Sequence, residues 1–221
     1  MQNVKIIIHS YDGVKQYWKY MIFLFKKYWP EMIENTIFLS EEESVNELQN
    51  FKTGVGAWSD RLITYLNQCT EEYVIYMQED FLLFEKVNHE MVKKLIKLMK
   101  TKNIDCLKIG DEAIVNDWPI NRTEKHKTMS LIDVPTNYKF YLSHQPISIF
   151  KRQILLDCLI PNEDPWSNEI IGSKRICNRG YSFKKIENHY IIPYMHGIIG
   201  GNFTDDAIKM IKEKEPTQWI W

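Results

Sequence analysis

The chain has 221 residues, of which 44% are hydrophobic and 26% charged, which is the composition of an ordinary globular protein rather than a disordered one. Its net charge is −1, so the charge balance gives no electrostatic case for binding nucleic acid. The length allows one large, well-filled core, and we expect a single domain over residues 1–221.

The four cysteines are far apart and form no CxxC pair, which argues against structural zinc. Each lies in or near an apolar run, so we expect buried thiols in a reducing compartment. No apolar run is long enough to span a membrane, and the nearest, Tyr20–Phe25, ends at two lysines. The N-terminus is too short in apolar length for a signal peptide. We therefore expect a cytoplasmic protein without a transmembrane segment, with peripheral association at the inner face of the membrane left open.

Apolar, β-rich runs alternate with helical stripes, which predicts an α/β fold with a central mixed, mostly parallel sheet flanked by helices. Strands are expected at Val4–Ile8, Thr36–Leu39, Tyr73–Met77, Cys106–Ile109, Tyr138–Leu142, Pro146–Phe150, Tyr181–Glu187 and His189–Pro193. Helices are expected at Val14–Tyr28, Asp60–Gln68, His89–Lys100 with Asn88 as cap, Lys151–Leu159, 165–178 and Ala207–Lys212. The acidic stretch Ser40–Asn50 predicts a solvated helix or loop, and the polar stretch Asp111–Thr136 an irregular segment.

Polar residues follow the first expected strand directly, namely His9, Ser10, Tyr11 and Asp12. Open α/β sheets bind ligands at the carboxyl ends of their strands, so these side chains are candidates for ligand contact. A plain strand-to-helix turn with Asp12 as the helix cap explains the same residues.

Ser59 is expected to cap the helix Asp60–Gln68, which places Arg61 in the first turn. A cation is mildly unfavourable at a helix N-terminus, so Arg61 there needs an anionic partner. That partner is a phosphate, Asp60 or a carboxylate across a cleft, and the sequence leaves the three open.

Gln78, Glu79 and Asp80 follow the strand Tyr73–Met77. Hard divalent cations are held by one or two carboxylates together with substrate phosphates, and two acids at the carboxyl edge of a sheet fit such a site. The alternative is an exposed polar turn between two strands.

Asp164 and Pro165 are a cap and a first helical residue, which predicts a helix start. Glu169 then lies about one turn in, on the side of Trp166. A carboxylate beside an indole suits a general base for a sugar hydroxyl, whereas a surface acid that complements the helix dipole is the plainer explanation.

His196 ends a late strand, before a glycine-rich loop. A lone histidine is more often structural, but this position also suits a metal ligand or a phosphate contact. Asp205 and Asp206 look like a cap for the last helix rather than a metal site.

Five short segments follow one another along the chain: Tyr28–Glu31 (YWPE), Gly54–Leu62 (G-x-G-x-W-S-x-R-L), Tyr73–Phe81 (YVIYMQEDF), Gln145–Lys151 (QPISIFK) and Pro165–Glu169 (PWSNE). With them the chain resembles nucleotide-sugar-dependent glycosyltransferases of the GT-A type, and more narrowly small bacterial surface-polysaccharide proteins with such segments. The resemblance covers most of the chain. It implies a Rossmann-like GT-A domain, a nucleotide-sugar donor, a saccharide or lipid-linked acceptor, and Mg²⁺ or Mn²⁺ as cofactor.

The resemblance also implies roles for single residues. On the donor side, residues 9–12 and Gln78 would line the nucleotide pocket, and Arg61 would approach the diphosphate. Glu79 and Asp80 would stand at the family's Asp-x-Asp metal motif, which here reads Gln-Glu-Asp, so Asp80 is the safer ligand.

On the acceptor side, the resemblance implies that Glu169 is the base of an inverting transfer, with Trp166 beside the acceptor. His196 would match a late metal or phosphate ligand. Retention of configuration is not excluded by the sequence.

Three other functions remain open. A nucleotidyltransferase also uses an α/β sheet, acids and a metal, but would be expected to carry a glycine-rich, basic phosphate loop after strand one, whereas His9–Gly13 has a single glycine and no arginine. A non-catalytic protein could bind a sugar nucleotide. A glycosidase would pair Glu79 or Asp80 with Glu169 across a sugar.

Overall fold

A sheet of eight strands forms the centre of the molecule. The computed structural model describes residues 3–112, 129–134, 147–177, 179–187 and 191–214. In spatial order the sheet contains β3 (Gln49–Lys52), β2 (Thr36–Ser40), β1 (Val4–His9), β4 (Tyr73–Gln78), β9 (Ser148–Lys151), β6 (Cys106–Lys108), β10 (Phe183–Glu187) and β8 (Ser130–Asp133).

Most strands of this sheet run in one direction. The neighbours β3, β2, β1 and β4 are parallel, and β6 is parallel to β10. Strand β9 lies between β4 and β6 and is antiparallel to both, and β8 is antiparallel to β10. The expected mixed, mostly parallel sheet is therefore confirmed.

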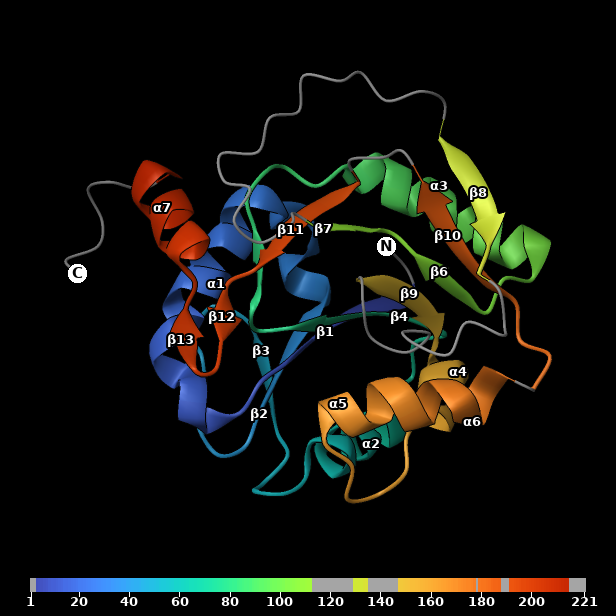
Figure 1. The fold of residues 1–221 in the computed structure, drawn as a ribbon, viewed down its shortest axis with the longest axis horizontal. Helices are drawn as coiled ribbons and strands as arrows, with labels where there is room; N and C mark the ends of the chain where they lie inside the picture. The colour runs from blue at the N-terminus through green and yellow to red at the C-terminus, as the bar shows by residue number, and fades with distance from the viewer. Residues whose placement is uncertain (1–2, 113–128, 135–146, 178, 188–190, 215–221) are drawn as a thin grey trace.

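Helices cover both faces of the sheet (Figure 1). The described helices are α1 (Lys15–Tyr28), α2 (Trp58–Gln68), α3 (His89–Lys102), α4 (Arg152–Asp157), α5 (Pro165–Ser167), α6 (Ser173–Cys177) and α7 (Asp205–Lys214). Short 3-10 turns, Asp12–Val14 and Pro30–Asn35, flank α1, and a π-helical turn, Asn168–Gly172, joins α5 to α6. None of the helices in this part of the chain combines the length and apolar character needed to cross a bilayer.

The apolar side chains of β1 alternate between the two faces of the sheet, which explains why both faces need a layer of helices. Ile6 and Ile8 pack with the cluster that includes Trp18 of α1, whereas Ile7 packs with the cluster that includes Leu62 of α2. Each of these isoleucines is fully buried, and a buried side chain of this size contributes about 1.5–3 kcal/mol. A continuous apolar strand is typical of a sheet that is covered on both faces.

A second, smaller sheet brings the late part of the chain to the end of β4. It contains β5 (Phe81–Leu83), β11 (Ile192–His196) and β7 (Gly110–Glu112), with β11 in the middle. The hairpin β12 (Ile198–Ile199) and β13 (Asn202–Phe203) follows β11. His196 pairs with Phe81 in this sheet, so it lies beside the turn that joins β4 to β5.

Several sequence expectations about elements need correction. The polar stretch Ser40–Asn50 runs into the edge strand β3, and the stretch Asp111–Thr136 contains parts of β7 and β8. Edge strands such as β3 and β8 are hard to predict because they bury little apolar surface. The expected strand Tyr138–Leu142 lies outside the described residues.

The helix caps were predicted with mixed success. Asn88 accepts from Met91 N at 3.1 Å, as expected for the cap of α3. At α7 the cap is Thr204, whose Oγ1 accepts from Ala207 N at 3.1 Å, and Asp205 lies within the first turn. Ser59 lies inside α2 rather than at its cap, because its hydroxyl is bonded to a distant loop.

The cysteine expectation is largely confirmed. All four are free thiols; Cys69, Cys106 and Cys158 are buried, and Cys177 is half-buried. Burial raises the pKa of the Cys106 thiol to about 12, so it is an unreactive core residue.

Candidate functional site

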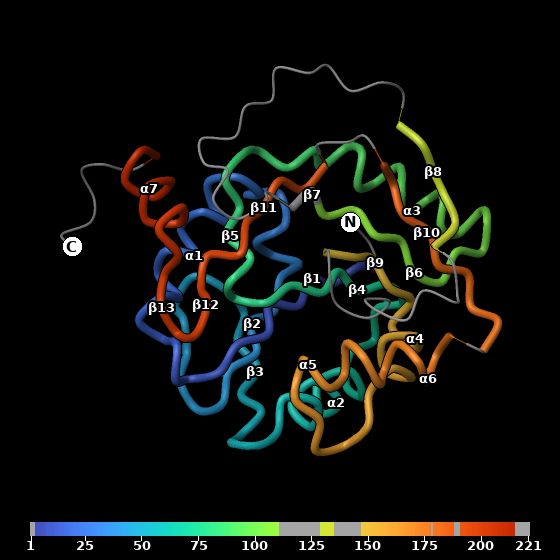
Figure 2. Tube along the Cα trace, viewed as in Figure 1, coloured from blue at the N-terminus to red at the C-terminus, as the bar shows by residue number. Residues whose placement is uncertain are grey.

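A pocket of about 420 Å³ opens at the carboxyl ends of β1 and β4. Its walls come from the end of β1, the start of α2, the β4–β5 turn, the start of α5 and the β12–β13 hairpin, whose Cα traces can be followed in Figure 2. Eight of the residues singled out from the sequence line it: His9, Ser10, Tyr11, Arg61, Gln78, Glu79, Asp80 and Trp166. The other three, Asp12, Glu169 and His196, lie outside its wall.

The floor of the pocket at β1 is held by hydrogen bonds within the protein. Ser10 N donates to Leu39 O at 2.9 Å, and Ser10 Oγ accepts from Trp18 Nε1 at 2.6 Å. His9 Nδ1 lies 3.3 Å from Tyr76 Oη, and both side chains are buried. This end of β1 is therefore preorganised.

Trp58 is a pocket residue to which the sequence analysis gave no role. Its ring stacks on His9 with 5.6 Å between centroids, and its Nε1 donates to Tyr76 Oη at 3.1 Å. The only sequence signal was its place in the Gly54–Leu62 segment, where aromatic character alone does not distinguish a core residue from a binding residue.

Asp12, predicted among the donor-binding residues, is not one of the residues that line the pocket, and its carboxylate is bonded to the loop after β2. Its carboxylate accepts from the backbone N–H groups of Glu41, Glu42 and Glu43, at 3.2, 3.0 and 3.1 Å. It does not cap α1 either, since no side chain caps that helix. Asp12 instead fixes the loop that follows β2.

Arg61 is a buried cation in the pocket wall. It is 6% exposed, and its Nη1 donates to Ser10 O at 2.5 Å. Burial lowers the pKa of its guanidinium, and the nearby acids, led by Glu41, oppose that effect. Asp60 is not its partner, because Asp60 Oδ2 accepts from Asn162 N at 3.2 Å.

Within the described residues, Arg61 Nε is buried with no hydrogen-bond partner, and no carboxylate lies within ion-pair distance of the guanidinium. A buried donor left without a partner costs free energy, which a bound anion would recover. Arg61 is therefore poised for a phosphate-like group that enters the pocket.

Glu79 and Asp80 form the turn between β4 and β5, and they are half-buried rather than exposed. Burial raises the pKa of the Glu79 carboxyl, the Asp80 charge raises it further, and Arg61 opposes the shift. These acids therefore lie in a turn between two strands, as the alternative from the sequence had it. The turn lines a pocket, however, instead of facing bulk water.

The β11–β12 junction packs tightly against this turn. Gly197 N donates to Asp80 O at 2.7 Å, and a Cβ at position 197 would lie 2.2 Å from Leu82 Cδ1. Only glycine permits this approach. Next to it, His196 Nδ1 lies 3.1 Å from Asp80 Oδ2, and the histidine ring packs edge-on against Phe81 at 4.9 Å.

The two oxygens of Asp80 differ. Oδ2 contacts His196, while Oδ1 is buried without a hydrogen-bond partner among the described residues. A carboxylate oxygen in this state fits a cation ligand. No three His, Cys, Asp or Glu side chains of the described chain form a group that could hold a metal alone, so Glu79, Asp80 and His196 are not a complete protein-only site.

Trp166 and Glu169 are separated by the local helix geometry. Asp164 Oδ1 accepts from Ser167 N at 2.9 Å, as expected of a cap, and Trp166 is 74% exposed on the pocket rim. The π-helical turn Asn168–Gly172 begins between Trp166 and Glu169. Trp166 lines the pocket, whereas Glu169 is not among its lining residues, so the role of Glu169 stays a prediction.

Lys108 of β6 is a buried lysine of the central sheet. It is 8% exposed, and burial lowers the pKa of its ammonium to about 8, with Cys106 and Glu169 opposing the shift. The electrostatic influence of the half-buried Glu169 therefore reaches Lys108, which the sequence spacing could not reveal.

Comparison with known proteins identifies the architecture. No protein family model matches the chain, and no curated protein sequence matches it. Among solved structures, S. aureus TarS residues 1–349 in complex with UDP-GlcNAc aligns with TM-score 0.62 and 14% identity, over 96% of this chain and 65% of that one. The fold is of the GT-A type. A fragment without ligand, TarS 1–349, gives 0.59 and 15%, over 88% and 60%.

The GT-A-like fold is also shared with nucleotidyltransferases. A cytidylyltransferase from Leptospira borgpetersenii aligns with TM-score 0.51 and 13% identity over 100% of both chains. The chain spans about 60–65% of the TarS fragments that it matches. At these identities the comparisons establish the fold, and the activity has to be argued from the pocket.

Proposed function

We propose that this protein is a glycosyltransferase that moves a sugar from a nucleotide-diphosphate donor to a saccharide or lipid-linked acceptor. The main support is one juxtaposition: a buried cation with an unsatisfied N–H, Arg61, and a buried carboxylate oxygen without a partner, Asp80 Oδ1, line the same pocket. A diphosphate that carries a divalent cation would satisfy both atoms at once.

The cofactor fits the residues present. We propose that Asp80 Oδ1, with Glu79 beside it, would hold Mg²⁺ or Mn²⁺ against donor phosphates, and that His196 orients Asp80 through Oδ2. Such a cation, when bound, would neutralise charge on the diphosphate leaving group. Arg61 would bind the same diphosphate from α2, and the Trp58–His9 stack would offer a flat apolar surface at the end of β1.

We propose that the acceptor binds at the rim of the pocket. Trp166 presents an exposed indole, which suits a sugar face. Glu169 remains our proposed base for an inverting transfer. Glu169 lies outside the pocket wall. For Glu169 to reach the acceptor hydroxyl, the acceptor would have to extend across the start of the π-helical turn toward Lys108. Glu79 is the competing candidate because it is a carboxylate that lines the pocket itself.

The fold alone is equally compatible with a nucleotidyltransferase, and one observation favours the glycosyltransferase. Nucleotidyl transfer is expected to use basic groups after β1 to bind the triphosphate, whereas the turn after β1 ends in Asp12, which is committed to the next loop. A glycosidase is less well supported, because Glu169 does not share the pocket with Glu79 and Asp80.

Isothermal titration with UDP, GDP, CDP and dTDP, each with and without Mn²⁺, tests the site. We expect one nucleotide to bind, and to bind more tightly with Mn²⁺. Transfer or hydrolysis of the matching nucleotide sugar would then separate an enzyme from a non-catalytic binder. Release of pyrophosphate from a nucleoside triphosphate and a sugar phosphate would instead assign a nucleotidyltransferase. No binding by any nucleotide would remove both the glycosyltransferase and the nucleotidyltransferase.

A further inference from the structure

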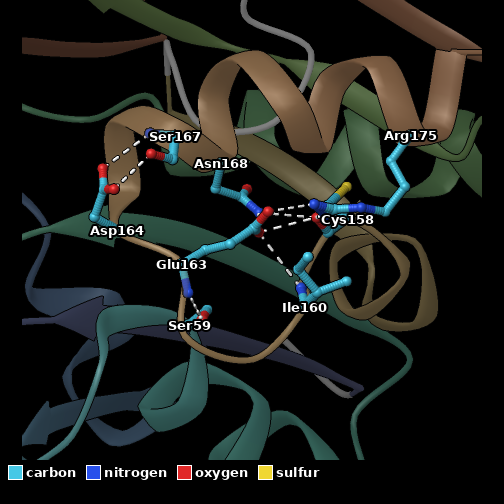
Figure 3. A network of polar contacts seen from close by, with 8 residues as sticks. All are labelled: Ser59, Cys158, Ile160, Glu163, Asp164, Ser167, Asn168 and Arg175. Atoms are coloured by element: carbon cyan, nitrogen blue, oxygen red, sulfur yellow. Dashed lines mark hydrogen bonds and ion pairs between the residues drawn. The ribbon is translucent and has the colours of Figure 1, made fainter.

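The two walls that carry Arg61 and Trp166 are joined by two hydrogen bonds. Ser59 N donates to Glu163 O at 3.2 Å. Glu163 N donates to Ser59 Oγ at 2.9 Å (Figure 3). Ser59 lies two residues before Arg61, and Glu163 three residues before Trp166. The start of α2 and the loop that leads into α5 are thus attached to each other directly.

The side chain of Glu163 ties this loop to the next helix. Glu163 is 8% exposed, and its Oε1 pairs with Arg175 Nη2 of α6. Its Oε2 accepts from Asn168 Nδ2 at 2.5 Å, and Arg175 Nη1 also donates to Cys158 O at 2.6 Å. Figure 3 shows these side chains converging beneath the α5–α6 segment. The carboxylate is therefore a hub for backbone and side-chain donors that precede and follow Trp166.

The π-helical turn is built around this hub. Asn168 is fully buried, and its Nδ2 also donates to Cys158 O at 2.8 Å. A Cβ at Gly172 would lie 2.8 Å from the Asn168 amide and 2.8 Å from Cys158 O, so a side chain there would collide with backbone. The glycine makes room for the asparagine that Glu163 holds, and the wide turn follows from that packing.

We infer that Glu163 is a positioning residue that holds the Trp166 rim and the Arg61 wall as one rigid unit. Glu163 is not among the residues that line the pocket, yet its backbone joins the loop before Trp166 to Ser59 of α2. The inference concerns the geometry of the pocket, so it goes beyond the proposed function and its main test needs no nucleotide.

The test uses the full chain labelled with 5-fluorotryptophan, with the resonances of Trp58 and Trp166 assigned from Trp→Phe variants. Glu163→Gln keeps the side-chain shape and removes the charge. Arg175→Lys keeps the charge but cannot reproduce two parallel N–H donors, so it should act like Glu163→Gln. In both variants we expect the Trp58 and Trp166 signals to shift or broaden, while the core residues Trp18 and Trp29 stay unchanged.

Asp157→Asn is the matched control. Its carboxylate also takes part in a polar network at the end of a helix, with Arg179 at 3.2 Å and Gln153 Nε2 at 2.8 Å. This network does not include the pocket loops. We expect it to leave the Trp58 and Trp166 signals as in the wild type. Unchanged Trp58 and Trp166 signals in both Glu163→Gln and Arg175→Lys, or equal changes in Asp157→Asn, would overturn the positioning role.

A second measurement links the unit to ligand binding. If UDP with Mn²⁺ binds the wild type, we expect Glu163→Gln to weaken binding by about tenfold, which corresponds to about 1.4 kcal/mol, and Asp157→Asn to leave it unchanged. An unchanged affinity for UDP in Glu163→Gln would also contradict the inference. Absence of nucleotide binding by the wild type would count against the proposed function alone, since the spectra without nucleotide still decide the positioning role.

Discussion

The two carboxylate oxygens of Asp80 have different surroundings, and this difference makes Asp80 suitable as the proposed cation ligand. Oδ2 lies against His196, and Oδ1 is buried without a protein partner in the described residues. We predict that Asp80→Asn abolishes the gain in nucleotide affinity that Mn²⁺ provides, because an amide is a poor ligand for a hard cation. Titration calorimetry with and without Mn²⁺ measures this; equal stimulation in variant and wild type would remove Asp80 from the metal site.

The identity of the base is also a question at the residue scale. We predict that Glu169→Gln leaves donor binding intact and lowers transfer by about 10²–10⁴-fold, the usual contribution of a general base. Glu79→Gln is the comparison, because Glu79 lies inside the pocket. Single-turnover transfer rates at saturating donor distinguish the two. Full activity in Glu169→Gln with loss in Glu79→Gln would move the base into the pocket wall.

At the scale of elements, the site depends on how closely the β11–β12 junction approaches the β4–β5 turn. We predict that Gly197→Ala lowers the free energy of unfolding by about 1–3 kcal/mol, the usual cost of overpacking, because its Cβ would lie 2.2 Å from Leu82 Cδ1. The displaced turn should also weaken nucleotide binding. Denaturant unfolding and calorimetry measure the two effects.

Gly56→Ala is the control for this substitution. A Cβ at Gly56 would meet only Arg61 Cγ, at 3.9 Å, which is ordinary contact. We expect its stability to change by less than about 0.5 kcal/mol, as for substitutions away from packed sites. A Gly197→Ala protein as stable as Gly56→Ala would show that the junction can relax without moving Asp80.

At the scale of the whole molecule, Lys108 makes stability depend on pH. Burial lowers the pKa of its ammonium to about 8 in the folded state, against about 10.4 in an unfolded chain. Between these values the unfolded state binds a proton that the folded state does not, so this group makes the free energy of unfolding rise with pH. The contribution is on the order of 3 kcal/mol across the window.

We therefore predict that Lys108→Met is more stable than the wild type at pH 7, and that its advantage shrinks as the pH approaches 10. Urea unfolding at a series of pH values tests this, with Lys209→Met, at a side chain 63% exposed, as the control. If the difference in free energy of unfolding between Lys108→Met and the wild type stays constant with pH, then Lys108 keeps its charge in the folded state.

The sequence by itself determined the strands that build the centre of the sheet and the residues at their ends. Continuous apolar runs placed β1 and β4, and because open sheets bind ligands at the carboxyl ends of their strands, His9 and Asp80 were each predicted to be ligand-binding residues. The structure brings both to one pocket. Arg61 in the first turn of α2 was predicted by the same local reasoning.

Only the tertiary structure decided which partners those residues meet. The contact of Asp80 with His196 joins residues 116 positions apart, and Asp12 turned to a loop 29 to 31 positions away. The π-helical turn that follows Trp166 depends on a buried asparagine, Asn168, which packs against Gly172 and Cys158 O. Local patterns encode which side chains are buried, whereas hydrogen-bond partners depend on how distant segments cross, and a single sequence carries no direct record of that crossing.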